Sequence, residues 1–204
     1  MDFRDVDDIV ARRRVAAPLH RSAGFSLLEL MMVITIVAIL LGIAVPSFRY
    51  VTNSNRVATE VNGLLGDMQF ARSEAIKEGA SISVCAAVNP TATAAACSGS
   101  NAWQTGWVVF VDVNGSGKMD NPADTVLRVQ PQFASATDTF LADNGVQFVT
   151  FNREGFATGL PNPANGYVTL TLHTVPVSAS WTRCLQINMV GNLTTQLPNQ
   201  GTCQ

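Results

Sequence analysis

The chain has 204 residues, of which 47% are apolar and 14% charged, and its 13 Lys and Arg against 15 Asp and Glu give a formal net charge of −2. This composition excludes a disordered tail, and the near-neutral charge excludes nucleic-acid binding through net charge alone. The length suits one ordinary domain with an appendage, since domains cluster near about 100–150 residues.

Residues 25–45 form an apolar run with a single charged residue, Glu29. A helix of this length spans about 32 Å, close to the thickness of a bilayer's hydrocarbon core. A secretory signal has a shorter apolar region of about 7–15 residues and a small-residue cleavage site, which the V-P-S-F sequence at 45–48 does not provide. The run therefore predicts a single-pass transmembrane helix that stays on the mature protein.

Glu29 is the anomaly of this run. A carboxylate inside an apolar membrane helix costs at least a few kcal/mol, and such residues usually face a partner. One interpretation places Glu29 at the membrane interface. The preferred one has the Glu29 carboxylate face a partner.

The sequence A-G-F-S-L-L-E-L at 23–30 resembles the processing site of type IV prepilins and type II secretion pseudopilins. The resemblance implies that a prepilin peptidase cleaves after Gly24 and N-methylates the new N-terminus, Phe25. It also implies that Glu29 pairs with the N-terminal amine of a neighbouring subunit. Pro46, just past the apolar run, matches the proline that bends the helix in this family.

Residues 1–24 would then be a cleaved leader. Four arginines near the membrane favour a cytoplasmic location for it, namely Arg12, Arg13, Arg14 and Arg21. The leader is longer than most in this family, so either translation starts downstream of Met1 or the extension is tolerated.

After Pro46, apolar residues recur with alternating spacings of four and three, which marks one face of a helix. This face consists of Val57, Val61, Leu64, Met68, Ala71 and Ala75. It is short for a coiled-coil seam, so we expect it to pack on the globular part of the chain. Together with the apolar run it predicts one long helix from Phe25 to about Gly79, in which residues 46–79 form the amphipathic half.

From residue 80 onward, the pattern changes to short apolar segments separated by turn signals such as Asn-Gly. The candidate strands are residues 81–88, 106–113, 125–129, 146–151, 167–174 and 183–190. The sequence therefore predicts an α+β fold. A long hydrophobic helix would pack on an antiparallel head of short strands, residues 80–204.

Four cysteines lie in this head and allow three disulfide connectivities. We favour pairing between sequence neighbours, Cys85 with Cys97 and Cys184 with Cys203, because each pair brackets a turn-rich excursion. A zinc site is excluded because there is no C-x-x-C spacing. Two disulfides place the head in an oxidising compartment, the periplasm or the cell surface.

Part of the head also resembles the GspH/FimT branch of the pilin-like family. The matching stretches are W-Q-T-G-W-V-V-F-V-D at 103–112, D-T-V-L-R at 124–128 and F-N-R-E-G-F at 151–156. With the N-terminal motif, the resemblance covers nearly the whole mature chain, and it implies a β-sandwich packed on the helix.

The segment 112–120 resembles the first half of an EF-hand loop. Its oxygen ligands would be Asp112, Asn114, Ser116 and Asp120. Position twelve is Ala123 and not the usual bidentate glutamate. We therefore prefer a polar loop held by Asx turns, with calcium as the alternative and no other cofactor expected.

DNA binding is the other alternative chemistry. Some FimT-like pilins capture DNA through a G-R-x-R motif, and the corresponding stretch here, 191–194, is G-N-L-T. A DNA footprint needs clustered cations, whereas those of the head are scattered in the sequence. They are Lys118, Arg128, Arg153 and Arg183. DNA binding is therefore not favoured.

Enzymatic activity is not expected. His173 is the one histidine after the leader, and the G-x-S-x-G, P-loop, H-E-x-x-H and G-x-G-x-x-G patterns are all missing from the sequence. We expect His173 to be a surface or packing residue. The one expected reaction makes this chain a substrate, cleaved after Gly24.

The resemblance implies a minor pilin of a type IV pilus that contributes to assembly or priming, with twitching motility or DNA uptake as further roles. A minor pseudopilin of a type II secretion system shares every motif, and a DNA-binding receptor at the pilus tip is a third hypothesis. The implied partners are other pilins or pseudopilins, the prepilin peptidase and the inner-membrane assembly platform. The implied location is the inner membrane, with the head in the periplasm, and then the pilus or pseudopilus.

Overall fold

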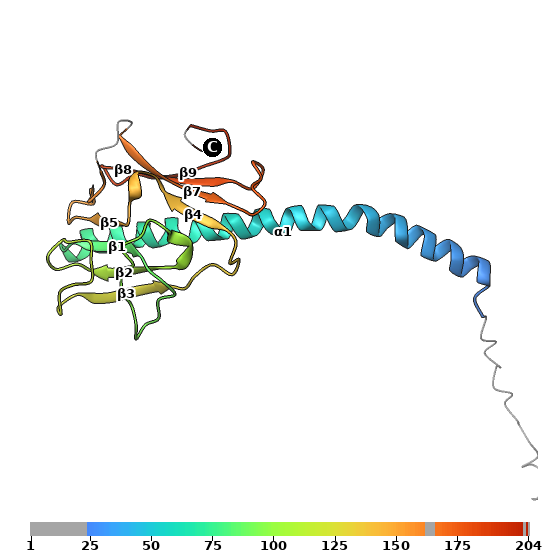
Figure 1. The fold of residues 1–204 in the computed structure, drawn as a ribbon, viewed down its shortest axis with the longest axis horizontal. Helices are drawn as coiled ribbons and strands as arrows, with labels where there is room; N and C mark the ends of the chain where they lie inside the picture. Colours follow the sequence, from blue (N-terminus) through green and yellow to red (C-terminus); the bar gives the residue numbers. More distant parts are fainter. Residues whose placement is uncertain (1–23, 162–165, 202, 204) are drawn as a thin grey trace, which may run out of the picture. The chain divides into compact units, whose positions relative to one another are not determined.

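The structure is a computed structural model that describes residues 24–161, 166–201 and 203 (Figure 1). The expected leader up to residue 23, with its arginines, lies outside the described residues. The chain divides into two compact units, one ending at Pro46 and the other beginning at Ser47. The second unit holds the head and is described below by itself.

One helix, α1 (Leu27–Glu78), accounts for the predicted long helix and contains Pro46. In its head part, all six residues of the predicted apolar face are buried, which confirms the periodicity. The helix ends at Gly79, whose amide donates a hydrogen bond to the carbonyl of Ala75 over 3.0 Å. The φ angle of Gly79 is +66°, a left-handed conformation that glycine adopts without steric cost.

Nine strands form two antiparallel sheets in the part of the chain that the structure describes. The five-stranded sheet has the order β3-β2-β1-β5-β6, and the four-stranded sheet has the order β4-β7-β8-β9. The first sheet consists of β1 (Ile82–Ala86), β2 (Trp107–Val111), β3 (Thr125–Gln130), β5 (Phe148–Phe151) and β6 (Ala157–Thr158). The second consists of β4 (Thr139–Ala142), β7 (Tyr167–His173), β8 (Arg183–Asn188) and β9 (Leu193–Gln196). Two short 3₁₀ turns, η1 (Trp103–Thr105) and η2 (Asp143–Gly145), lie between strands.

Each of the six predicted strands occurs within about two residues of its expected bounds, whereas β4, β6 and β9 were not predicted. The strand β6 has only two residues, and β9 reads L-T-T-Q with a single apolar side chain. Such segments lack a period-two apolar pattern and are extended because a neighbouring strand pairs with them.

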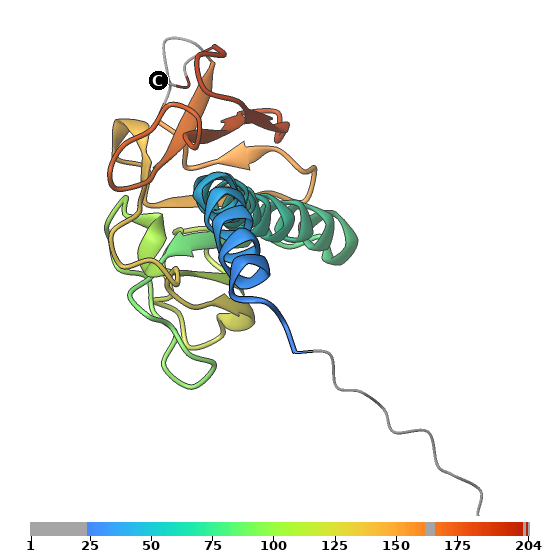
Figure 2. The same ribbon diagram turned by 90° about the vertical axis from the view of Figure 1, so that its right-hand side faces the viewer.

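One hydrophobic cluster joins the two sheets to the head part of α1. Buried residues of the helix, such as Leu64 and Met68, belong to the same cluster as Val84 of the first sheet and Leu170 of the second. A smaller, separate cluster contains Cys85, Val108 and Phe110. Figure 2 shows strands of both sheets arranged around one side of the helix. This arrangement confirms the predicted α+β class with an antiparallel head.

Both disulfides join sequence neighbours, which is the pairing that the sequence favoured. Cys85 of β1 is bonded to Cys97 in the following loop, and Cys184 of β8 is bonded to Cys203 in the C-terminal tail. Each bond therefore ties a loop or tail to a strand of one sheet. The two sheets are held to each other by the core and the helix.

Candidate assembly segment and head surface

Ser26 begins the helix. Its Oγ accepts a hydrogen bond from the amide of Glu29 over 3.1 Å, and its carbonyl accepts one from the amide of Leu30 over 3.1 Å. Ser followed three residues later by Glu is the spacing of a capping box, a signal that the sequence analysis missed. Because the helix starts after Ser26, Gly24 and Phe25 lie in non-helical chain, and the Phe25 side chain is 81% exposed.

Glu29 lies in the first turn of α1, where the partial positive charge of the helix N-terminus favours a carboxylate. Its residue is exposed, and the described part of the chain gives its carboxylate no ion pair. Glu29 therefore lies four positions after Phe25 in the sequence, and its exposed carboxylate is accessible to a second chain.

The apolar side chains of the first unit are exposed. These include Leu28, Met32, Ile36, Leu40 and Ile43. Across the described residues, α1 is the helix that is long and apolar enough to cross a membrane, and the mean hydropathy of its apolar window is 2.7. Exposed apolar surface of this extent marks a contact with lipid or with other chains.

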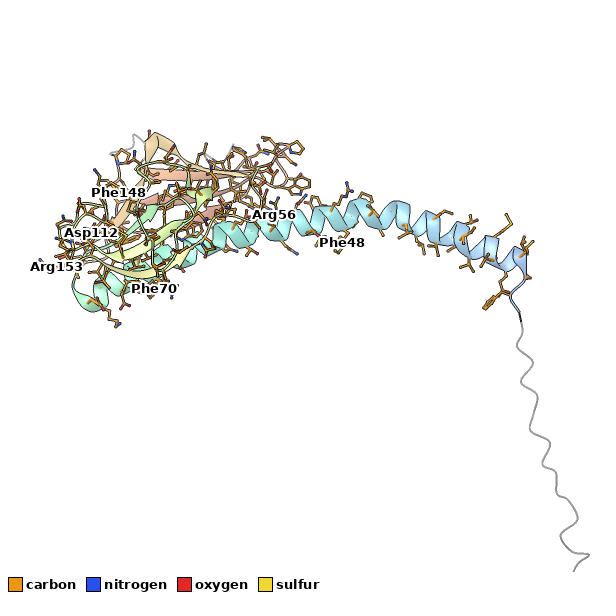
Figure 3. The ribbon with its side chains drawn as sticks, turned by 60° about the horizontal axis from the view of Figure 1, so that its bottom comes forward. Phe48, Arg56, Phe70, Asp112, Phe148 and Arg153 are labelled. Carbon is orange, nitrogen blue, oxygen red and sulfur yellow. A yellow bond between two sulfur atoms is a disulfide. The ribbon has the colours of Figure 1, made fainter. Side chains whose placement is uncertain are left out.

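In the head, Asp67 of α1 fixes the neighbouring sheet through two contacts. Its Oδ2 accepts a hydrogen bond from the buried Trp107 indole over 2.8 Å, and its Oδ1 lies 3.0 Å from Nη1 of Arg128. The Arg128 guanidinium also lies 3.6 Å from the centroid of the Phe70 ring (Phe70 is labelled in Figure 3). One carboxylate therefore aligns β2 and β3 against the helix.

Arg72 of α1 reaches turns of both sheets. Its Nε donates to the carbonyl of Gly155, which follows β5, over 3.0 Å, and its Nη2 donates to the carbonyl of Val190, which follows β8, over 3.3 Å. The two turns also touch, because a Cβ added at Gly191 would overlap the carbonyl oxygen of Gly155. The helix thus holds both sheets together at this end of the head.

Arg56 of α1 also makes a polar contact with the head, close to Glu60. Its Nη1 lies 2.6 Å from Oδ2 of Asp138, whose side chain is 1% exposed. Burial raises the pKa of the nearby Glu60 carboxyl to about 7, an effect that Arg56 opposes and Asp138 reinforces. Glu60 lines a cavity of about 400 Å³ together with the rings of Trp107 and Phe133.

The calcium candidates form a loop whose oxygens are occupied by hydrogen bonds from the protein. Asp112 is buried and accepts bonds from the amides of Ser116 and Gly117 and from the Ser83 hydroxyl. Asp120 accepts bonds from Asn114 and Ser116. The described residues contain no group of three His, Cys, Asp or Glu side chains suited to a metal ion. The loop geometry is that of Asx turns.

The four cations considered for DNA have different surroundings in the head. Arg128 pairs with Asp67, and Arg153 pairs with Glu154 at 2.7 Å. Arg183 donates to the carbonyls of Ser180 and Thr182, and Lys118 is exposed in the 112–120 loop. Figure 3 shows Arg153 and Asp112 at one end of the head and Arg56 well away from them. Three of the four cations are thus engaged within the protein.

His173 is at the end of β7, half-buried, with Nδ1 3.3 Å from the Thr182 hydroxyl. This contact joins the ends of β7 and β8. It fits the packing role expected for this histidine.

Two family models match the chain. The one described as Type II transport protein GspH matches residues 60–191, and the one described as Prokaryotic N-terminal methylation motif matches residues 19–45. No curated protein matches the chain significantly.

The fold is similar to that of the type IV minor pilin FimU from Pseudomonas aeruginosa. One crystal form of FimU shares 23% identity with a TM-score of 0.53, and the match covers 71% of this chain and 91% of FimU. A second crystal form has 22% identity and a TM-score of 0.49, with coverage of 68% and 91%. The first likeness establishes a pilin-like fold, in which antiparallel sheets follow a long N-terminal helix.

Proposed function

Since the chain belongs to the GspH family of type IV pilin-like proteins, we propose that it is a minor pilin of a type IV pilus that contributes to pilus assembly or priming. Proteins of this family are structural subunits that assemble with other pilins, not enzymes. The observation that carries the proposal is the N-terminal segment, where a non-helical Gly24-Phe25 bond precedes a capped apolar helix with an open Glu29 carboxylate.

The proposal assigns a role to each part of the chain. Residues 1–24 form a leader that prepilin peptidase removes, and Phe25 becomes the methylated N-terminus. Residues 25–45 lie in the inner membrane and later in the filament core, and residues 46–79 continue the helix into the head. Residues 80–204 form the head in the periplasm. The two disulfides support this location because they persist in oxidising compartments.

In the filament, the Glu29 carboxylate accepts the N-terminal amine of a neighbouring Phe25. Glu29→Gln keeps the size of the side chain but removes its charge, so this variant should be processed, stay in the membrane and enter filaments poorly. Gly24→Val is the matched control, because it should block cleavage while leaving Glu29 intact. Immunoblots of membrane and sheared-filament fractions measure both steps, and wild-type amounts of Glu29→Gln in filaments would remove the proposed ion pair.

A minor pseudopilin of a type II secretion system is the second candidate, which the description of the family model favours. A clean deletion should be scored for surface piliation, natural transformation and release of extracellular enzymes. The proposal expects loss of piliation or transformation with normal secretion. Loss of secretion with normal pili would assign the chain to a secretion system.

A DNA receptor at the pilus tip is a weaker candidate because three of the four head cations are engaged within the protein. Calcium binding in the 112–120 loop is likewise not favoured, since the loop's carboxylates already accept protein hydrogen bonds. Neither activity is needed for the proposed role.

A further inference from the structure

An apolar patch lies on the head unit where the chain enters it from residue 46. Three of its residues belong to α1 and three, including Trp181, to the connection between β7 and β8. Apart from Trp181, they are Phe48, Tyr50 and Val51, exposed by 73%, 51% and 50%, with Val175 and Val177, exposed by 60% and 69%. Trp181 of the β7–β8 connection joins the two groups, because its ring centroid lies 6.2 Å from that of Tyr50. We call these six residues the aromatic–valine patch.

Several polar groups of the β7–β8 connection are bonded within it while its valines are exposed. The indole nitrogen of Trp181 is an exception, since it is buried without a hydrogen-bond partner among the described residues. The Thr174 hydroxyl donates to the carbonyl of Pro176 over 3.0 Å. The carbonyl of Ser178 accepts the amide of Trp181 over 3.0 Å and both the amide and the hydroxyl of Thr182 over 3.1 Å. A loop with internally bonded polar groups loses less when it leaves water, since unsatisfied backbone groups are costly in an apolar medium.

The segments that form the patch carry little charge. The segments 47–52 and 174–181 contain no acidic residue and one basic residue, Arg49, which is exposed. Tyr and Trp are the side chains that concentrate where a membrane meets water, because they combine an apolar ring with a polar group. An arginine beside them can contact lipid phosphates while its stem lies along apolar surface.

The patch is continuous with the membrane-anchoring segment along the chain. Phe48 follows Val45, the last residue of the apolar run, by three positions, or about 4.5 Å of helix rise. We propose that the aromatic–valine patch inserts into the lipid interface of the bilayer that holds residues 25–45, so that the head rests on the membrane before the subunit enters a filament. This inference requires the membrane-anchored state and is independent of which filament system uses the chain.

The test uses the full chain in liposomes. All four native cysteines are paired, so an added cysteine offers a single thiol for an environment-sensitive nitrobenzoxadiazole label. The label is placed at Val177→Cys, and Val113→Cys is the matched control, an exposed valine next to Asp112 at the other end of the head (Figure 3). The liposomes contain either plain phospholipid or phospholipid with a nitroxide quencher on the acyl chain.

At Val177, the proposal expects a blue-shifted emission and a loss of intensity with the quencher lipid, and Val175→Cys should behave in the same way. At Val113, the emission should remain that of a label in water and should not respond to the quencher lipid. Equal behaviour at Val177 and Val113 would overturn the proposal. A blue shift that persists in detergent and grows with protein concentration would also overturn it, because a second copy of the chain would then cover the patch.

Discussion

At the scale of single residues, Asp67 carries more than one contact. It is the hydrogen-bond partner of the buried Trp107 indole and the ion-pair partner of Arg128, so it positions two strands from one place on α1. The two contacts differ in strength, because the indole is buried whereas the Arg128 side chain is 47% exposed. Leaving a buried donor without a partner costs about 1–3 kcal/mol, and an exposed ion pair contributes less than about 1 kcal/mol.

We therefore expect Asp67→Ala to lower the free energy of unfolding by about 2 kcal/mol, measured by chemical denaturation in detergent. Asp67→Asn retains an acceptor for the indole and should lose less than about 1 kcal/mol, and so should Arg128→Ala. If Asp67→Ala lowered the free energy of unfolding no more than Arg128→Ala does, the hydrogen bond from the Trp107 indole would not be the important contact.

Glu60 predicts a pH dependence of stability. Burial raises the pKa of Glu60 from 4.5 to about 7 in the folded protein. Between these two pH values, Glu60 is therefore mostly protonated in the folded chain and mostly ionised in the unfolded chain. Stability from this group is present below about pH 4.5 and is lost as the pH rises toward 7.

Glu60→Gln removes this titration and should raise the unfolding temperature at pH 8, where the wild-type carboxylate is charged, but have little effect at pH 5. Because Glu60 is only half-buried, solvent screening limits the gain to about 1 kcal/mol. Glu78→Gln, exposed on the same helix, is the control for the loss of one charge. A gain that is equal at both pH values would contradict the expectation.

At the scale of elements, the buried face of α1 could be predicted because a helix packed on one side repeats its apolar residues every three or four positions. The disulfide pairing could also be predicted, because each cysteine is bonded to its nearest cysteine neighbour in the sequence. The strands β4, β6 and β9 could not be predicted because they are only two to four residues long. The strand β4 pairs with the distant β7, whereas β6 and β9 each pair with the strand just before them, β5 and β8. The Asp67–Trp107 bond spans 40 residues and has no local signal, whereas the capping box at Ser26 did have one and was overlooked.

Two glycines predict opposite effects of the same substitution. Gly66 lies in the exposed interior of α1, and an added Cβ would meet nothing within 4 Å, so Gly66→Ala should stabilise the protein by about 0.5–1 kcal/mol. Gly191 has a φ of +77°, and its Cβ would strike the carbonyl oxygen of Gly155. Gly191→Ala should therefore destabilise the protein. Thermal unfolding of both variants measures the contrast, and a shift of the same sign in both would contradict it.

At the scale of the whole molecule, each disulfide strengthens one sheet without joining it to the other. The bond between Cys184 and Cys203 closes a separation of 19 residues and holds the C-terminal tail on β8, where Cys203 is fully buried. The assembly of the two sheets instead depends on the shared core around α1.

Replacing both Cys184 and Cys203 by serine should lower the free energy of unfolding by about 3 kcal/mol, since the unfolded chain gains the freedom of the opened loop. Replacing both Cys85 and Cys97 by serine should lower the free energy of unfolding slightly less, because this disulfide closes a separation of only 12 residues. Denaturation midpoints of the two double variants, compared with the wild type, measure this order. An unchanged midpoint without the Cys184–Cys203 bond would contradict it.

The two bonds that Arg72 makes to Gly155 and Val190 have a mechanical consequence. The proposed assembly draws the subunit out of the membrane by its N-terminal segment, which would put tension along its helix. Arg72 bonds to turns of both sheets, so tension along the helix would act on both sheets and not on one alone. The head then resists traction as one body and does not release one sheet while the helix keeps the other.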